Sequence, residues 1–189
     1  MKKFIILMAS VALFAGCAST ETIKRLESQN GQGVFQVIDA AAKPLPEGYG
    51  DLKISLNLKT RTSNAVLINT KHHGTEHYQF LVGINGQTQR LVGKMIPETG
   101  EYRGSKDPEA GTGVRYAFET TVRLPVGLHK VTFALPGDGV VLEQALEVKH
   151  GENSVVLQPL YNRKNPHQRI GFNGDTTFYE GVKSLRIKE

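Results

Sequence analysis

The chain has 189 residues, with 23 Lys and Arg against 18 Asp and Glu, so its formal net charge is +5. The basic residues are scattered and form no stripe, which argues against a nucleic-acid-binding protein.

The first 16 residues have the three parts of a bacterial export signal. Met1-Lys2-Lys3 is cationic, residues 4–14 are apolar, and Ala15-Gly16 supplies small residues. The apolar part is too short to remain as a membrane-spanning helix. Removal of residues 1–16 leaves 173 residues, with 21 basic and 18 acidic side chains. That length suits one domain of moderate size or two small β modules that share an interface.

The stretch LFAGC, residues 13–17, resembles the lipobox of bacterial lipoproteins. The resemblance implies that the thiol of Cys17 is diacylated and that the chain is cut just before it. Cys17 is the only cysteine in the sequence, so no intramolecular disulfide competes for it. In such lipoproteins, Ala18 rather than Asp after the cysteine implies the outer membrane.

Residues 17–33 are predicted to form a lipidated flexible tether. Ile23 and Leu26 are the only apolar side chains between Ala18 and Gly33, apart from alanine, and the segment ends in a glycine-rich turn. We expect one helical turn there at most. Residues 34–189 then form the folded domain.

Alternation with a period of two predicts a series of strands in that domain. Leu52, Ile54, Leu56 and Leu58 alternate with polar residues that should face solvent, namely Lys53, Ser55, Asn57 and Lys59. Asn85-Gly86 predicts a type I′ hairpin turn. Before residue 97, the expected strands are 34–38, 52–58, 65–68, 78–84 and 88–96.

Residues 114–161 predict four strands in succession, separated by turn residues at 125–127, 136–139 and 150–153. Their spacing is typical of a meander in a β-sandwich. A polar excursion at 97–113 precedes them, short strands are expected at 169–172 and 176–179, and Val182, Leu185 and Ile187 should close the sheet. The expected core includes Phe80, Phe118, Val131 and Phe133.

No helix longer than a turn or two is expected after the signal, so the predicted fold is an all-β, immunoglobulin-like antiparallel sandwich. Residues 82–87, VGINGQ, and residues 120–160, from TTVRLPVGLHKVTFALPGDG to SVVLQPL, resemble the PEGA-type module of bacterial surface proteins. The PEGA-like part covers about 78–161. It departs from that family at Gly137-Asp138-Gly139, where Gly-Tyr is usual. The resemblance implies a small β-sandwich that serves as a binding or spacer unit, with no catalytic residues of its own.

The sequence KHHGTEH at residues 71–77 is the one cluster suited to metal chemistry. His73, Glu76 and His77 fit the pattern H-x-x-E-H, in which two histidines bind zinc and the glutamate activates water. That pattern requires a helix, whereas Gly74-Thr75 and the flanking strands favour an exposed hairpin loop. His129 and His150 lie near turns and are expected at the surface.

The functional expectation is a non-catalytic cell-envelope lipoprotein, attached to the outer membrane through Cys17, that binds an envelope protein or a glycan and needs no cofactor. No cysteine nucleophile, G-x-S-x-G elbow, P-loop or Ser-x-x-Lys motif occurs in the predicted domain. A metal-binding protein or metal-dependent hydrolase that uses His73, Glu76 and His77 is the alternative.

Overall fold

A computed structural model describes residues 15–29, 44–63, 71–101, 107–163 and 177–188. The strands expected at 34–38, 65–68 and 169–172 lie outside these residues.

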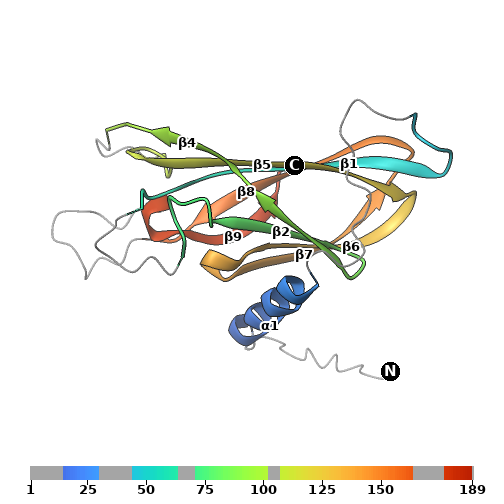
Figure 1. The fold of residues 1–189 in the computed structure, drawn as a ribbon, viewed down its shortest axis with the longest axis horizontal. Coiled ribbons are helices and arrows are strands. Elements are labelled where there is room, and N and C mark those ends of the chain that lie inside the picture. Colours follow the sequence, from blue (N-terminus) through green and yellow to red (C-terminus); the bar gives the residue numbers. More distant parts are fainter. Residues whose placement is uncertain (1–14, 30–43, 64–70, 102–106, 164–176, 189) are drawn as a thin grey trace, which may run out of the picture.

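Two β-sheets form the body of the molecule, with one hydrophobic core between them (Figure 1). The five-stranded sheet has the order β4-β5-β1-β8-β9 and the four-stranded sheet the order β3-β2-β6-β7. The strands of the first sheet are β4 (Lys94–Glu98), β5 (Gly113–Pro125), β1 (Tyr49–Thr60), β8 (Gly151–Tyr161) and β9 (Val182–Ile187). Those of the second are β3 (Gln87–Val92), β2 (Gln79–Ile84), β6 (Gly127–Leu135) and β7 (Val140–Val148). The prediction of an all-β sandwich is confirmed at this level.

The expected meander is wrong, because β5 to β8 do not follow one another in a single sheet. β5 pairs with β1, β6 and β7 form a hairpin in the other sheet, and β8 returns to the first sheet beside β1. The strand pairs are antiparallel except β1 and β8, which run parallel from Gly50 opposite Gly151. After β5 the chain leaves the five-stranded sheet, forms the β6–β7 hairpin in the other sheet, and returns as β8. Because β8 enters the five-stranded sheet at the same end as β1, the two strands run parallel.

Alternation along the strands fills the core as the sequence predicts. Leu52, Ile54, Leu56 and Leu58 on β1 are each at most 2% exposed. Phe80, Phe118, Val131 and Phe133 are buried as well, and the rings of Phe80 and Phe133 are stacked with centroids 6.1 Å apart. Burial of large apolar side chains is the main favourable term in folding.

The predicted hairpin turn is confirmed, since Asn85 and Gly86 both have positive φ, at 49° and 85°. The strand expected at 88–96, however, is divided at Gly93 into β3 and β4, which belong to different sheets. A side chain at Gly93 would meet the ring of Phe118, with Cε1 only 2.8 Å from an added Cβ. The chain therefore changes sheets at the one residue here that leaves room for the core aromatic ring.

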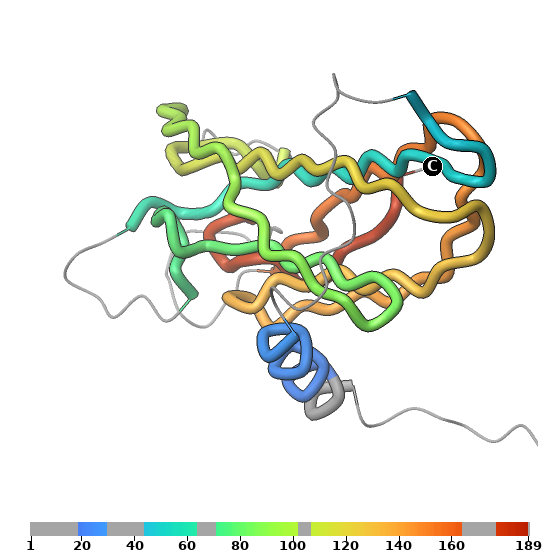
Figure 2. The backbone as a smooth tube through the Cα atoms, turned by 45° about the vertical axis from the view of Figure 1, so that its right-hand side comes forward, coloured from blue at the N-terminus to red at the C-terminus, as the bar shows by residue number. Residues whose placement is uncertain are grey.

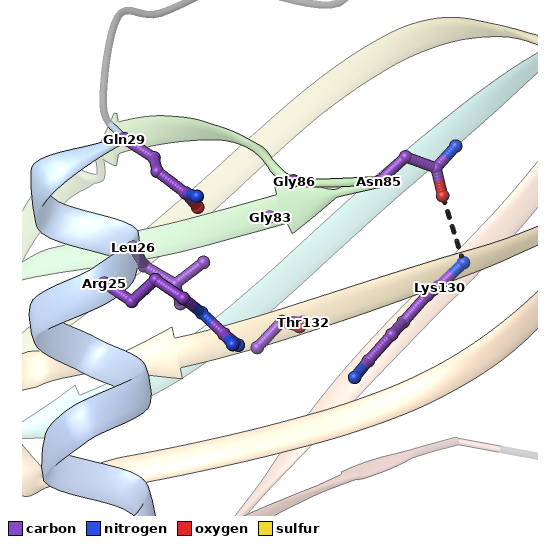
Figure 3. Close-up of a pocket in the computed structure, with 8 residues that line it drawn as sticks. All are labelled: Arg25, Leu26, Gln29, Gly83, Asn85, Gly86, Lys130 and Thr132. Carbon is purple, nitrogen blue, oxygen red and sulfur yellow. Dashed lines mark hydrogen bonds between the residues drawn. The ribbon is translucent and has the colours of Figure 1, made fainter.

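The N-terminal segment corrects the expectation of a flexible tether. Residues Ala15–Ser28 form a 14-residue helix, α1, which lies on the outer side of the four-stranded sheet (Figures 1 and 2). Ile23 and Leu26 are buried against Leu81 and Ala134 of the sheet, and Leu26 points toward Gly83 (Figure 3). A short helix is marginal alone but is stabilised when one apolar face packs on a partner. Two apolar residues three apart are enough for this contact.

The C-terminal part contains a second correction. Thr177 caps a short 3₁₀ helix, η2 (Phe178–Glu180), where a strand was expected at 176–179. Phe178 is buried in the core. The last expected strand is confirmed, since β9 pairs with β8 at the edge of the five-stranded sheet.

Candidate functional site

The His-loop, residues 71–78, precedes β2 and is attached to the 3₁₀ turn η1 (Pro136–Asp138) through buried polar groups. Nε2 of His73 lies 3.1 and 3.2 Å from the two carboxylate oxygens of Asp138, so its N–H donates to that group. The hydroxyl of Tyr78 donates to Asp138 over 2.7 Å. The Asp138 side chain is fully buried. Lys71, partly exposed, completes the cluster with its ammonium 3.4 Å from the carboxylate.

The charges of this cluster favour an ionised Asp138 beside a protonated tyrosine. Burial alone would raise the pKa of Asp138, but the hydrogen bond and charge of His73, with help from Tyr78 and Lys71, outweigh it, and the pKa is lowered. Burial, and then the negative charge of Asp138, raise the pKa of Tyr78 well above its ordinary value. Tyr78 therefore remains a hydrogen-bond donor at physiological pH.

Backbone and hydroxyl contacts hold the rest of the His-loop. The hydroxyl of Tyr116 donates to the carbonyl of Thr75 over 2.8 Å, and the N–H of Gly74 donates to the Thr60 hydroxyl over 3.1 Å. Thr75 also closes the loop on itself, because its hydroxyl donates to the carbonyl of His72 over 2.7 Å. Partners on β1 and β5 thus fix the conformation of the loop.

The structure does not bring His73, Glu76 and His77 together. His73 is 1% exposed and directed at Asp138, whereas Glu76 and His77 are exposed. The ring of His77 instead lies near that of His72, with centroids 6.0 Å apart. Among the described residues, no group of three or more His, Cys, Asp or Glu side chains is arranged to hold a metal ion. The expectation that the whole loop is solvated is wrong at His73, because Asp138 supplies an ionic partner inside the fold.

A pocket of about 370 Å³ opens beside the exposed side of the His-loop, between that loop, the end of α1 and η1. Its lining is mostly polar and includes two imidazoles, an ammonium group and an amide. The lining residues are Glu27, Lys71, His72, His77, Tyr78, Gln79, Pro136 and Gly137.

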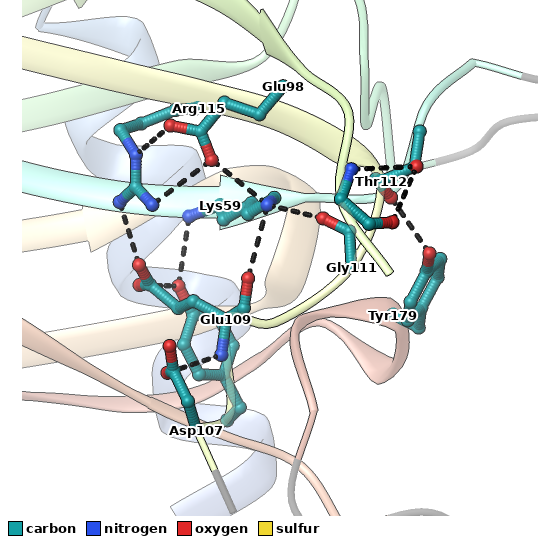
Figure 4. Close-up of polar contacts among 10 residues, drawn as sticks. Lys59, Glu98, Asp107, Glu109, Gly111, Thr112, Arg115 and Tyr179 are labelled. Atoms are coloured by element: carbon teal, nitrogen blue, oxygen red, sulfur yellow. Dashed lines mark hydrogen bonds and ion pairs between the residues drawn. The ribbon is translucent and has the colours of Figure 1, made fainter. Parts of the chain in front are cut away.

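A second buried polar network surrounds Lys59, at the end of β1 (Figure 4). The ammonium group of Lys59 contacts Glu98 over 2.9 Å and donates to the carbonyls of Gly111 and Glu109 over 2.6 and 3.1 Å. It also lies 5.0 Å from the centroid of the Phe178 ring. Lys59 was expected on the solvent face of its strand, but the backbone of residues 109–111 covers it.

Arg115 joins both acids of the Lys59 network. Its guanidinium makes two bonds to Glu98, of 2.6 and 3.2 Å, and one to Glu109 of 2.7 Å. Hydrogen bonds from Arg115 and Lys59 lower the pKa of Glu98 to about 2. Tyr161 donates to Glu109 over 2.5 Å and accepts the N–H of Lys59 over 2.9 Å. These bonds fix residues 107–112, the described end of the predicted excursion.

Two other histidines of the predicted domain, His129 and His150, differ in burial. His129 is buried, against expectation: its Nε2 donates to the carbonyl of Pro125 over 2.7 Å and its Nδ1 accepts from the Asn85 amide over 2.8 Å. It therefore ties the β5–β6 connection to the β2–β3 hairpin. His150 is exposed, as predicted, with Nδ1 2.9 Å from the carbonyl of Tyr49.

No protein-family model, curated protein or solved structure matches the chain. Among the described residues, no helix is both long and apolar enough to cross a membrane.

Proposed function

We propose that the protein is a lipid-anchored binding module of the bacterial outer membrane, without a catalytic centre, and that its sandwich is of the PEGA-like kind. The sequence LFAGC at residues 13–17, with Cys17 as the only cysteine, supports the anchor. The turns that resemble a PEGA module fall between strands of the sandwich, which is compatible with that kind of domain.

The binding function is inferred from the His-loop, which is held by buried polar contacts and presents side chains to a pocket. His73 and Asp138 hold the loop in place, and His72 and His77 line the adjoining pocket of about 370 Å³. Tyr78 and Lys71 contact Asp138 and line the pocket as well. A rigid loop that presents polar side chains to a pocket is suited to recognition. Because the lining is polar, we propose a glycan of the cell envelope as its ligand.

The alternative of a zinc hydrolase has less support. A catalytic zinc needs three protein ligands around an open position, and His73 is turned away from His77 toward Asp138. Nor is the His73–Asp138 pair placed to act as a general base, because the His73 ring is 1% exposed and does not line the pocket.

Mass spectrometry of the detergent-extracted protein tests the anchor. We expect a diacylglyceryl group on Cys17 and no residues before it, and we expect Cys17→Ser to be released from the membrane or to keep its signal. A soluble wild-type protein with an unmodified Cys17 thiol would reject the anchor.

Histidine NMR spectra test the binding site. Addition of soluble oligosaccharides released from the cell wall should shift the imidazole signals of His72 and His77, and the double variant His72→Ala/His77→Ala should lose the affinity. His150→Ala removes an equally exposed imidazole elsewhere and serves as the control. If His150 responds as strongly as His72 and His77, the pocket is not the site.

A further inference from the structure

The outer face of the four-stranded sheet is built to receive α1. Leu81 and Ala134 on this face are completely buried beneath the helix, and Thr88 beside them is 1% exposed. Gly83 leaves the space that Leu26 occupies, since an added Cβ would lie 2.6 Å from Leu26 Cδ2. The small residues Gly83 and Ala134 at the contact let the helix approach the sheet closely.

One ion pair also joins α1 to the sheet. Glu143 of β7 lies 3.6 Å from Arg25 of the helix and 3.1 Å from Lys130 of β6. Figure 3 shows Arg25 and Lys130 extending over the same outer face, on either side of Thr132. The helix is thus fixed by both apolar and charged contacts.

The same face carries the two most exposed large apolar side chains described. Leu128 on β6 is 74% exposed and Val92 on β3 is 68% exposed. Alternation places both on the outer face, because their neighbours Leu91 and His129 point inward and are buried. Each has a basic residue two positions away on the same face of its strand, Arg90 beside Val92 and Lys130 beside Leu128. Lys130 is paired with Glu143, and Glu147 lies opposite Leu128 on the neighbouring strand. Exposed apolar side chains on this face would enter the headgroup region of a membrane that the acyl anchor holds close.

We propose that the outer face of the four-stranded sheet lies against the lipid surface, with α1 as a rigid stalk between the acyl anchor and the sandwich. This inference rests on the proposed acylation of Cys17. Ile23, whose side chain is buried against the sheet, follows Cys17 by six positions, which is a rise of about 9 Å along a helix. A flexible tether of the 17 residues expected from the sequence, 17–33, would span about 23 Å on average.

The direction of the helix agrees with a stalk. In Figures 1 and 2 the C-terminal end of α1 approaches the four-stranded sheet and the helix extends away from both sheets toward its N-terminal end. An anchor at that end places the four-stranded sheet next to the membrane. The five-stranded sheet, on the opposite side, then faces away from the lipid.

Fluorescence quenching in vesicles tests this orientation. Acylated Ala145→Cys and Asn57→Cys variants each carry one free thiol, because Cys17 is blocked by its lipid. Both positions are exposed, Ala145 on the outer face of β7 opposite Lys130 and Asn57 on the outer face of β1. Each is labelled with bimane in phosphatidylethanolamine–phosphatidylglycerol vesicles that contain headgroup spin-labelled phosphatidylcholine. We expect several-fold stronger quenching at position 145 than at position 57.

A substitution at the contact between α1 and the sheet distinguishes a rigid stalk from a randomly oriented domain. Leu26→Asp, combined with each label, should reduce the ratio of the two quenching efficiencies to near one, whereas Ser28→Asp adds the same charge on an exposed position of α1 and should preserve the ratio. Equal quenching at the two positions of a protein whose mass shows acylation, or a ratio that survives Leu26→Asp, would overturn the inference alone. An unmodified Cys17 in the mass spectrum would instead overturn the proposed anchor together with it.

Discussion

The carboxylate of Asp138 organises the His-loop, because it is fully buried and accepts hydrogen bonds from both His73 and Tyr78. A buried ionised group that loses a donor bears the cost of its lost solvation. The stability of the loop should therefore depend on each hydroxyl or imidazole that reaches Asp138.

Tyr78→Phe removes one such donor with little change in volume. We expect it to lower the free energy of unfolding by about 1.5–3 kcal/mol, the usual range for a hydrogen bond to a charged group. Tyr179→Phe is the matched control, because its hydroxyl bonds to the carbonyl of Thr112 at an exposed position, and it should cost at most about 1 kcal/mol. Urea unfolding of the three proteins measures both differences; a loss at Tyr78 no greater than at Tyr179 would mean that Asp138 is solvated.

Glu98 makes the free energy of unfolding depend on pH in the acidic range. The pKa of Glu98 is lowered from 4.5 to about 2 by Arg115 and Lys59, so folding favours its charged form. Its contribution is present in full above pH 4.5 and is lost as the pH falls toward 2. The stability advantage of the wild type over Glu98→Gln should therefore be constant near neutral pH and shrink across this window. Unfolding at a series of pH values measures it, with Glu119→Gln, whose partner Lys53 is exposed, as the control.

At this scale the sequence predicts residue types better than partners. The expectation that His73 is solvated is wrong, whereas Glu76 and His77 are exposed as predicted. The ligand of His73, however, is an aspartate 65 positions away, and only the approach of η1 to the His-loop brings them together. In the sequence, Gly137-Asp138-Gly139 indicates only a turn, so no local pattern points to this contact.

Strand β1 shows both the strength and the limit of alternation as a guide to elements. Its apolar residues point into the core, and Lys53 and Asn57 on the other face are exposed as predicted. Lys59 obeys the same alternation but is 3% exposed, because residues 107–112 fold over the end of the strand. Alternation determines which face a side chain occupies, and a distant loop decides whether that face is covered.

Two lysines on this strand form a natural pair for comparison. Lys59→Met leaves the partly buried Glu98 with one fewer cation and leaves two carbonyls without a donor, so we expect it to cost about 3 kcal/mol. Lys53→Met breaks only the exposed pair with Glu119 and should cost less than about 1 kcal/mol. Chemical denaturation measures both, and hydrogen exchange should also show faster exchange at 107–112 in Lys59→Met. Similar costs for the two variants would contradict a buried network.

The predictions of the other elements succeeded or failed for identifiable physical reasons. The β2–β3 hairpin was predictable because Asn-Gly supplies the required positive φ at two successive positions. Helix α1 was missed because two apolar residues carry almost no periodic signal, and its stability comes from the sheet on which Leu26 packs. The break at Gly93 was missed because the reason for it, the ring of Phe118, lies on another strand.

For the whole molecule, the sequence predicted the class of fold and not the assignment of strands to sheets. Turn residues at 125–127 and 136–139 look alike in the sequence, yet the first connects two sheets and the second closes a hairpin within one. The choice depends on which pairing buries the shared core, and local turn chemistry does not encode it. The parallel pair of β1 and β8 follows from that choice.

The unequal sizes of the two apolar clusters also predict how the molecule opens. The main core contains the inward residues of both sheets. The buried contact between α1 and the four-stranded sheet consists only of Ile23, Leu26, Leu81 and Ala134. Separation of the helix from the sheet exposes only the second cluster, so it requires less free energy than global unfolding.

Amide hydrogen exchange of the mature protein measures this difference. The amides of α1 should exchange faster than those of β2 and β6, because they open without the sandwich. Leu26→Ala removes part of the smaller cluster and should accelerate exchange in α1 further while leaving β6 unchanged. Ser28→Ala, at an exposed position of the same helix, should alter exchange in α1 much less. Equal protection of α1 and β6, with both affected alike by Leu26→Ala, would mean that the helix unfolds only with the whole domain, as one cooperative unit.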